Sequence, residues 1–199
     1  NAISHLTTQG ATRIYKMDSN YATHMVTLNL KDNSYLEFIP EQIIPYKNSR
    51  FYQKTNLEID DSSTVVYSET IVPGRIAMGE MFDFDVCYLK TEGKINGKIK
   101  FRDTSLLTPK TQKIQALTMF DDKTILTSVY VLTKKDVTKI NDLINELFSH
   151  TQNMSGGSSV MPNNSGISIR ILGNSSEDQK ITIYEILKII RKEILPDYL

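Results

Sequence analysis

A single cysteine, Cys87, occurs among the 199 residues, so the chain cannot form an internal disulfide bond. Such sparse cysteine usage is typical of a reducing compartment, and we expect a cytoplasmic protein. No run of apolar residues approaches the ~20 that a membrane-spanning helix requires. The first residues, Asn1-Ala2-Ile3-Ser4, include neither an initiator Met nor a basic start followed by an apolar stretch, so we expect no signal peptide.

The sequence also lacks an excess of charge of either sign. Lys and Arg together number 23, as do Asp and Glu, which leaves a net charge of zero. Nucleic acids and anionic membranes attract proteins with a basic surface, and we therefore expect neither as a partner. With 40% hydrophobic and 23% charged residues, the composition is that of a globular protein. We expect residues 1–199 to form a single domain with a sizeable core.

Signatures of catalysis are equally scarce. The three histidines, His5, His24 and His150, lie far apart, and no His-x-x-x-His or Cys-x-x-Cys pair indicates a closed zinc site. No Gly-x-Ser-x-Gly nucleophile motif occurs. Cys87 stands in an alternating segment without a basic neighbour, which favours a structural thiol. The residues thus predict a protein that is not an enzyme, although a hydrolase with a dispersed active site stays an alternative.

What the sequence does contain is a period-two alternation of apolar and polar residues through its first two thirds. Residues 26–38 alternate on both sides of a polar turn, and residues 51–59, 65–67 and 82–88 continue the pattern. Asn96-Gly97, between apolar segments, is the strongest short signal for a β-hairpin. Short strands with frequent turns predict an all-β sandwich, a barrel or a coiled stack of sheets.

Two helices are expected in the last third. Thr133 and Asp136 resemble a capping box before a segment with helical apolar spacing. Ser176 and Gln179 open a second such segment, which Pro196 ends. Between these helices we expect loops at residues 155–159 and 162–166 and a final strand at residues 167–171.

The most unusual local feature is Pro73-Gly74-Arg75, followed by Gly79-Glu80, between two β segments. The glycines permit close backbone approach, and Pro73 fixes the entry of the chain. One interpretation is a tight corner with Arg75 paired to Glu69 or Glu80. The other is a charged corner that faces a cavity, and the residues alone leave both open.

Several motifs resemble those of the UreD (UreH) family of urease accessory proteins. They occur in the family's order along the whole chain. The segments are Leu6–Lys16, Tyr35–Pro40 with Ile44-Pro45-Tyr46 and Ser49-Arg50, Pro73–Arg75 with Gly79–Phe82, Ile169–Gly173, and the helix around Ile186–Arg191. The family also carries an N-terminal part with a Gly-Gly-x-x-x-Gly-Asp segment, to which nothing in this sequence corresponds.

This resemblance implies a mostly β fold, a helically coiled stack of β-strands with two peripheral α-helices. It implies a scaffold in urease maturation that binds apo-urease and UreF, and UreG through UreF. No cofactor is expected to be permanently bound, but the resemblance implies transient passage of Ni²⁺ toward the urease active site. The alternative is a generic β-rich protein-binding module unrelated to urease.

The resemblance places nickel-path candidates at Thr12, Glu69 and Asp103. Isolated carboxylates and hydroxyls suit passage better than His or Cys clusters, because they attract a cation without trapping it. For Glu69 a structural ion pair with Arg75 is the competing interpretation, since a buried carboxylate requires a partner. Glu37 is expected on the face opposite the core. The residues expected to shape the fold are Glu37, Pro40, Arg50, Pro73, Gly74, Arg75, Gly79 and Glu80.

Overall fold

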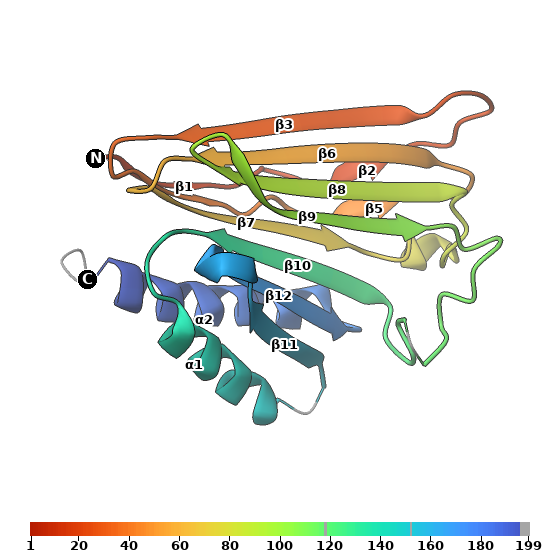
Figure 1. Ribbon diagram of the computed structural model, residues 1–199. Helices are drawn as coiled ribbons and strands as arrows, with labels where there is room; N and C mark the ends of the chain where they lie inside the picture. The colour runs from red at the N-terminus through yellow and green to blue at the C-terminus, as the bar shows by residue number, and fades with distance from the viewer. Residues whose placement is uncertain (118, 152, 196–199) are drawn as a thin grey trace.

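Three layers make up the computed structural model, which describes residues 1–117, 119–151 and 153–195 (Figure 1). We call the four-stranded layer the outer sheet and the eight-stranded layer the helix-covered sheet. The outer sheet contains β3 (Ala22–Leu30), β6 (Arg50–Ile59), β8 (Val86–Ile95) and β9 (Lys98–Leu107). The helix-covered sheet contains β1 (Ile3–Leu6), β2 (Thr12–Ile14), β4 (Tyr35–Phe38), β5 (Ile43–Pro45), β7 (Thr64–Ile71), β10 (Ile125–Leu132), β11 (Ser155–Val160) and β12 (Gly166–Gly173). The helices are α1 (Thr138–Ser149) and α2 (Ser176–Ile194), and the short 3₁₀ turns are η1 (Ile76–Met78) and η2 (Pro162–Asn164).

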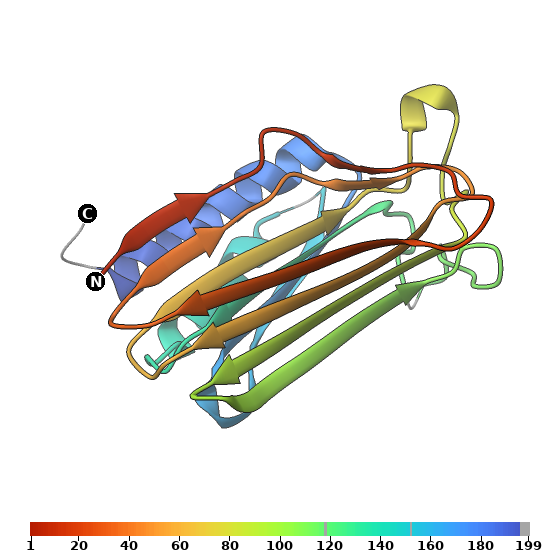
Figure 2. The same ribbon diagram turned by 90° about the horizontal axis from the view of Figure 1, so that it is seen from above.

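The first half of the chain winds between the two sheets. β1, β4 and β7 pair in parallel in one sheet, while β3, β6 and β8 pair in parallel in the other. Figure 2 shows these two sets of arrows pointing in opposite directions. The expected coiled stack of strands is therefore confirmed. The chain then turns back through the predicted hairpin at Asn96-Gly97, where both residues adopt positive φ.

Apolar side chains fill both spaces between the layers. Under the helices, Val129 and Ile169 of the helix-covered sheet contact Ile144 of α1 and Ile186 of α2. Between the sheets lie two separate clusters, one around Phe51, Phe84 and Cys87 and the other around Leu57, Tyr67 and Leu132. The helix-covered sheet thus has both faces buried, whereas the outer sheet has one. Within the described part of the chain, no helix is long and apolar enough to cross a membrane.

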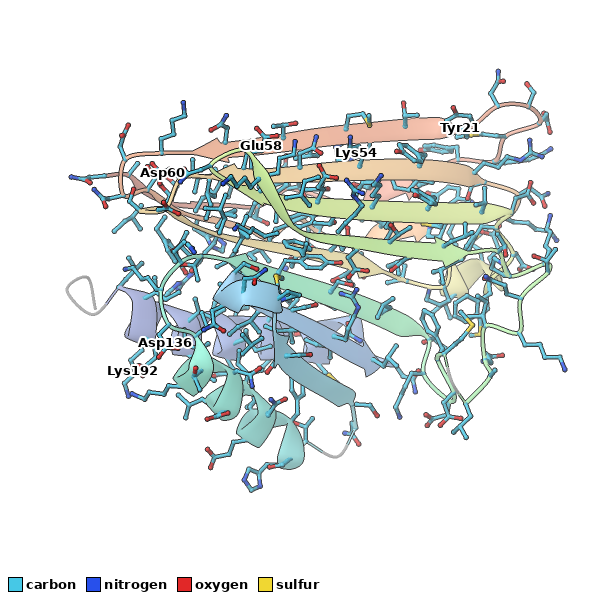
Figure 3. The ribbon with its side chains drawn as sticks, in the orientation of Figure 1. Tyr21, Lys54, Glu58, Asp60, Asp136 and Lys192 are labelled. Carbon is cyan, nitrogen blue, oxygen red and sulfur yellow. The ribbon has the colours of Figure 1, made fainter. Side chains whose placement is uncertain are left out.

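Polar turns stack at one end of the coil. The backbone N–H of Asp32 donates to Asp60 Oδ2 over 2.8 Å, and that of Asn33 donates to Ser62 Oγ over 2.9 Å. Asp60 and Lys192 lie at the end of the molecule opposite Tyr21 (Figure 3). Each turn of the coil is therefore tied to the next by side chains as well as by strand pairing.

The predicted cap of the first helix is wrong. Helix α1 begins at Thr138, and Asp136 Oδ1 accepts the Thr138 N–H over 3.0 Å. Thr133 is instead fully buried, with its hydroxyl 2.8 Å from that of Thr64 on β7. The Thr133 side chain therefore contacts a β-strand and does not cap the helix.

Two further expectations for the last third need correction. The cap of α2 is Ser175, one residue before the predicted position, and its hydroxyl accepts the Asp178 N–H. Residues 155–159, expected as a loop because of their Ser and Gly content, belong to the edge strand β11. Asn145 of α1 bonds both the N–H and the C=O of Ser158, which supports this strand along its free side. Pro196 lies outside the described residues. The final strand, predicted at residues 167–171, is confirmed as β12.

The prediction that Glu37 lies outside the core is wrong. Its side chain does point away from the space between the sheets, but α2 covers that face of the helix-covered sheet. It is 1% exposed. The Arg191 guanidinium donates to both carboxylate oxygens over 2.7 and 2.5 Å, the Tyr35 hydroxyl donates to Oε1 over 2.8 Å, and His5 Nδ1 lies 2.7 Å from Oε2. Burial opposes ionisation, but these hydrogen bonds outweigh it and lower the pKa of Glu37. Glu37 therefore joins β1, β4 and α2.

We predict that Arg191→Met lowers the free energy of unfolding by about 3 kcal/mol, because it leaves the buried Glu37 carboxylate without its charged partner. Lys188→Met is the matched control on the same helix. It removes an exposed pair with Glu185, and its cost should stay below about 1 kcal/mol. Urea unfolding of both variants measures the difference, and equal costs would contradict this role of Glu37.

Candidate functional site

A band of polar side chains separates the two apolar clusters between the sheets. Along β6, Phe51 belongs to one cluster and Leu57 to the other, while Gln53 and Thr55 lie between them on the same face. Two in-register rows continue this band across the sheets. The rows are Glu69–Ser128–Arg170 on the helix-covered sheet and Thr55–Thr91–Asp103 on the outer sheet. We call these six residues, together with Gln53, Tyr67 and Tyr130, the polar band.

Glu69 is the buried carboxylate at the centre of this band, 4% exposed. Gln53 Nε2 and the Tyr67 hydroxyl each donate to Oε2 over 3.2 Å, and the Tyr130 hydroxyl lies 3.4 Å from Oε1. Burial raises the pKa of Glu69 to about 7, because these neutral donors and the more distant Arg170 compensate the lost hydration only in part. The predicted ion pair with Arg75 is wrong.

Asp103 is joined to Glu69 through a tyrosine. The Tyr130 hydroxyl lies 3.0 Å from Asp103 Oδ2 as well as 3.4 Å from Glu69 Oε1, so two carboxylates compete for one hydroxyl proton. Arg170 donates from Nη1 to the same hydroxyl over 3.2 Å and from Nη2 to Asp103 Oδ2. The structure thus places two of the three predicted nickel-path residues within one hydrogen-bonded network.

Thr12, the third predicted residue, meets Glu69 in a cavity. The cavity has a volume of about 90 Å³, and its lining includes Thr12, His24, Gln53, Tyr67 and Glu69. Such a volume holds several water molecules. His24 stands at the exposed edge strand β3, with Nδ1 3.0 Å from Gln53 Oε1. Asp103 is not among the lining residues, so the cavity reaches Glu69 and the hydrogen bonds of Tyr130 continue beyond it.

The segment Pro73–Glu80 forms a tight corner in which Arg75 pairs with Glu80, which is the first of the two interpretations of this segment. The Arg75 guanidinium donates to Glu80 from Nε over 2.9 Å, and lies 4.0 Å from the centre of the Tyr46 ring. Gly74 and Gly79 have φ values of 141° and 75°, which other residues adopt only with strain. The Pro73 carbonyl accepts the Phe82 N–H over 2.7 Å and closes the corner.

The remaining predicted residues lie outside the polar band. Arg50 donates from Nε to Asp85 Oδ2 over 2.9 Å at the start of β6. Pro40 lines the cavity from the β4–β5 connection. Cys87 is fully buried among apolar side chains, and burial raises the pKa of its thiol well above the usual range, in keeping with a structural role.

Sequence reasoning predicted only Thr12, Glu69 and Asp103 here, and the side chains that it missed include His24, Gln53, Tyr67, Tyr130 and Arg170. A usable signal existed for Gln53, because it interrupts the apolar face of an otherwise regular strand. Tyr67 likewise stands two residues before Glu69, on the same face. Arg170 and Tyr130 gave no such signal, since only the register of β10 and β12 brings them beside Asp103 and Glu69.

The site supplies carboxylate, hydroxyl and amide oxygens, a combination that suits loose coordination of a hydrated divalent cation. Among the described residues, no group of three or more His, Cys, Asp and Glu side chains is close enough to hold a metal ion.

A family model described as UreD urease accessory protein matches residues 1–197. A urease accessory protein UreD of Cenarchaeum symbiosum is 35% identical over 178 residues, which cover 88% of this chain and 62% of that protein. A UreD 2 protein of Brucella canis is 33% identical, covering 96% and 65% of the two chains. A UreD protein of Yersinia pseudotuberculosis is 32% identical, covering 98% and 62%. The chain therefore spans less than two thirds of the length of these relatives.

The raised pKa of Glu69 predicts that the free energy of unfolding depends on pH. Its folded-state pKa of about 7 lies above the ordinary value of 4.5, so the folded protein holds this proton more tightly. The contribution to stability is complete below the ordinary value and is lost as the pH rises through about 7. The Glu69→Gln variant has no group that ionises at this position, so its stability does not fall with rising pH for this reason.

In metal-free buffer, the free energy of unfolding of Glu69→Gln relative to the unaltered protein should therefore rise by about 3 kcal/mol between about pH 4.5 and pH 8. Urea unfolding at both pH values measures this change. Glu58→Gln, on the outward face of β6, is the control and should show little change. A constant difference for Glu69→Gln would contradict the raised pKa.

Proposed function

Because this chain belongs to the UreD family of urease accessory proteins, we propose that it acts in urease maturation as a scaffold that lets nickel ions pass between its two sheets. One observation carries the proposal. Thr12 and Glu69, 57 positions apart in the sequence, line the same cavity, and Tyr130 joins Glu69 to Asp103 beyond it.

The chemistry of the polar band supports passage. From the cavity into the band a cation meets one hydroxyl at Thr12, one carboxylate at Glu69 and one carboxylate at Asp103 in succession, and none of these described positions offers several strong ligands. Each contact is weak enough to be exchanged for water or for the next oxygen. Transport sites need this balance between entry and release.

We propose that the partners of this scaffold are apo-urease and UreF, with the nickel-carrying UreG joined through UreF. Family membership supports this assignment. We further propose that the chain catalyses no reaction itself and holds no permanent cofactor. Nickel is then its cargo, and Thr12, Glu69 and Asp103 are contacts along the route.

The proposal predicts that Glu69→Gln and Asp103→Asn each reduce urease activation by roughly tenfold or more, because each removes a carboxylate from the path without changing its size. The measurement is urease activity after incubation of apo-urease, UreF, UreG, GTP and Ni²⁺ with the full-length protein or its variants. Glu58→Gln removes a carboxylate from the opposite face of the outer sheet and should activate normally.

Co-purification with UreF and apo-urease should be unaffected in all three variants, since the altered side chains lie inside the fold or away from the band. Normal activation by both Glu69→Gln and Asp103→Asn, with complexes of normal composition, would contradict a nickel path through the polar band.

A further inference from the structure

The far end of the polar band already contains a cation. Arg170 projects from β12 into the space between the sheets, and its guanidinium contacts both Asp103 Oδ2 and the Tyr130 hydroxyl. The guanidinium carbon also lies 5.4 Å from the centre of the Tyr130 ring. Arginine remains charged at every physiological pH, so Asp103 has a permanent counter-ion in this structure.

This counter-ion contacts Oδ2, one of the two Asp103 oxygens that a metal ion would use. A carboxylate paired with a guanidinium attracts a second cation less strongly, because the guanidinium charge offsets its own charge and the two positive charges repel each other. Any cation arriving from Glu69 therefore meets Arg170 before it can bind Asp103.

The Arg170–Asp103 pair is partly exposed to solvent. Its side chain is 36% exposed and that of Asp103 is 27% exposed, so the pair lies at the margin of the inter-sheet space. The long aliphatic part of an arginine side chain allows the charged end to reach water while the stem stays packed. Pairs with this exposure to solvent are weak compared with fully buried ones.

The strand pairing also places a hydroxyl group next to Asp103, and this hydroxyl is a possible metal ligand. Thr91 is the in-register neighbour of Asp103 on β8, and it is 1% exposed. Its hydroxyl has no hydrogen-bond partner among the described residues. A buried hydroxyl without a partner is costly and rare in folded proteins. With Arg170 withdrawn, Thr91 and Asp103 would offer two oxygen ligands from adjacent strands.

We propose that Arg170 is a resident counter-cation that closes the Asp103 end of the polar band, and that a divalent metal ion binds Asp103 and Thr91 only when Arg170 swings away. Arg170 is thus a gating residue that sets the affinity of this end for metal. The biological meaning of this gate rests on the proposed nickel path, but the competition between Arg170 and a metal ion is a property of the chain itself.

Titration of the full-length protein with nickel sulfate, followed by calorimetry, tests this directly. Arg170→Met should bind Ni²⁺ about tenfold more tightly than the unaltered protein, because a neighbouring positive charge has been removed. Arg102→Met is the matched control. It removes an arginine from the same strand as Asp103, one that pairs with Glu92 on the outward face, and it should leave the affinity unchanged.

Three further variants identify the site at which the affinity for Ni²⁺ increases. Asp103→Asn combined with Arg170→Met should abolish the gain and bind Ni²⁺ no more tightly than the unaltered protein, because the ligand carboxylate is gone. Arg170→Lys should show no gain because it keeps the charge. Arg170→Gln should reproduce the gain and replaces Arg170→Met if that variant fails to fold. No gain in a folded neutral variant, or a gain that survives Asp103→Asn, would overturn the proposal.

The outcomes separate this inference from the proposed function. If the neutral variants bind Ni²⁺ more tightly while Glu69→Gln and Asp103→Asn activate urease normally, Arg170 does compete with metal but the nickel path fails. If activation depends on both carboxylates while Ni²⁺ affinity is unchanged by the loss of Arg170, the path stands and the gate is refuted.

Discussion

A carboxylate buried between two β-sheets must be solvated by the protein, and most of the site follows from how Glu69 meets this requirement. Its oxygens contact Gln53, Tyr67 and Tyr130, which are neutral groups drawn from three strands. Neutral donors compensate less of the lost hydration than a cation would, so the pKa of Glu69 rises. A directly paired arginine would have stabilised the charge but would also have occupied the carboxylate.

The same fold contains the opposite solution at Glu37. That carboxylate lies on the other face of the helix-covered sheet, and Arg191 binds both of its oxygens. Its pKa is lowered, and its role is to hold β4 and α2 together. Two buried glutamates on neighbouring strands thus have pKa values shifted in opposite directions, because one has a charged partner and the other has hydroxyl and amide partners beside a cavity.

The coiled path of the chain is what assembles the polar band. Each turn of the coil adds strands to both sheets, so residues far apart in sequence come to face one another across the interior (Figures 1 and 2). Thr12, Glu69 and Asp103 come from β2, β7 and β9, and Arg170 comes from the last strand, β12. The band runs across the strands, and no single segment of the sequence contains it.

Period-two alternation predicted the β character of the fold and several of its longer strands, although β8 begins at Val86 and not at residue 82. The hairpin at Asn96-Gly97 followed from its turn residues. Alternation also showed which residues share a face, but not whether that face is buried. Glu37 was misplaced for this reason, because the sequence does not reveal that α2 covers the second face of its sheet. The edge strand β11 was missed because Ser and Gly at residues 155–159 have little strand propensity, and its pairing with β12 overrides that preference.

The candidate site was predictable in part. Motif resemblance located Thr12, Glu69 and Asp103, but the wrong partner was assigned to Glu69 because Arg75 is near it in sequence. Arg170 is 101 positions away from Glu69, and only strand register brings the two into one row. Long-range register of this kind depends on the whole fold, so local patterns could not have identified Arg170 or Tyr130.

The most direct test of a nickel path is anomalous X-ray scattering at the nickel absorption edge, from crystals of the full-length protein soaked in nickel sulfate. An anomalous peak inside the cavity, within coordination distance of Glu69, is the predicted result. Nickel bound only at surface groups such as His150, with Glu69 still held by Gln53 and Tyr67 and no peak between the sheets, would contradict the account.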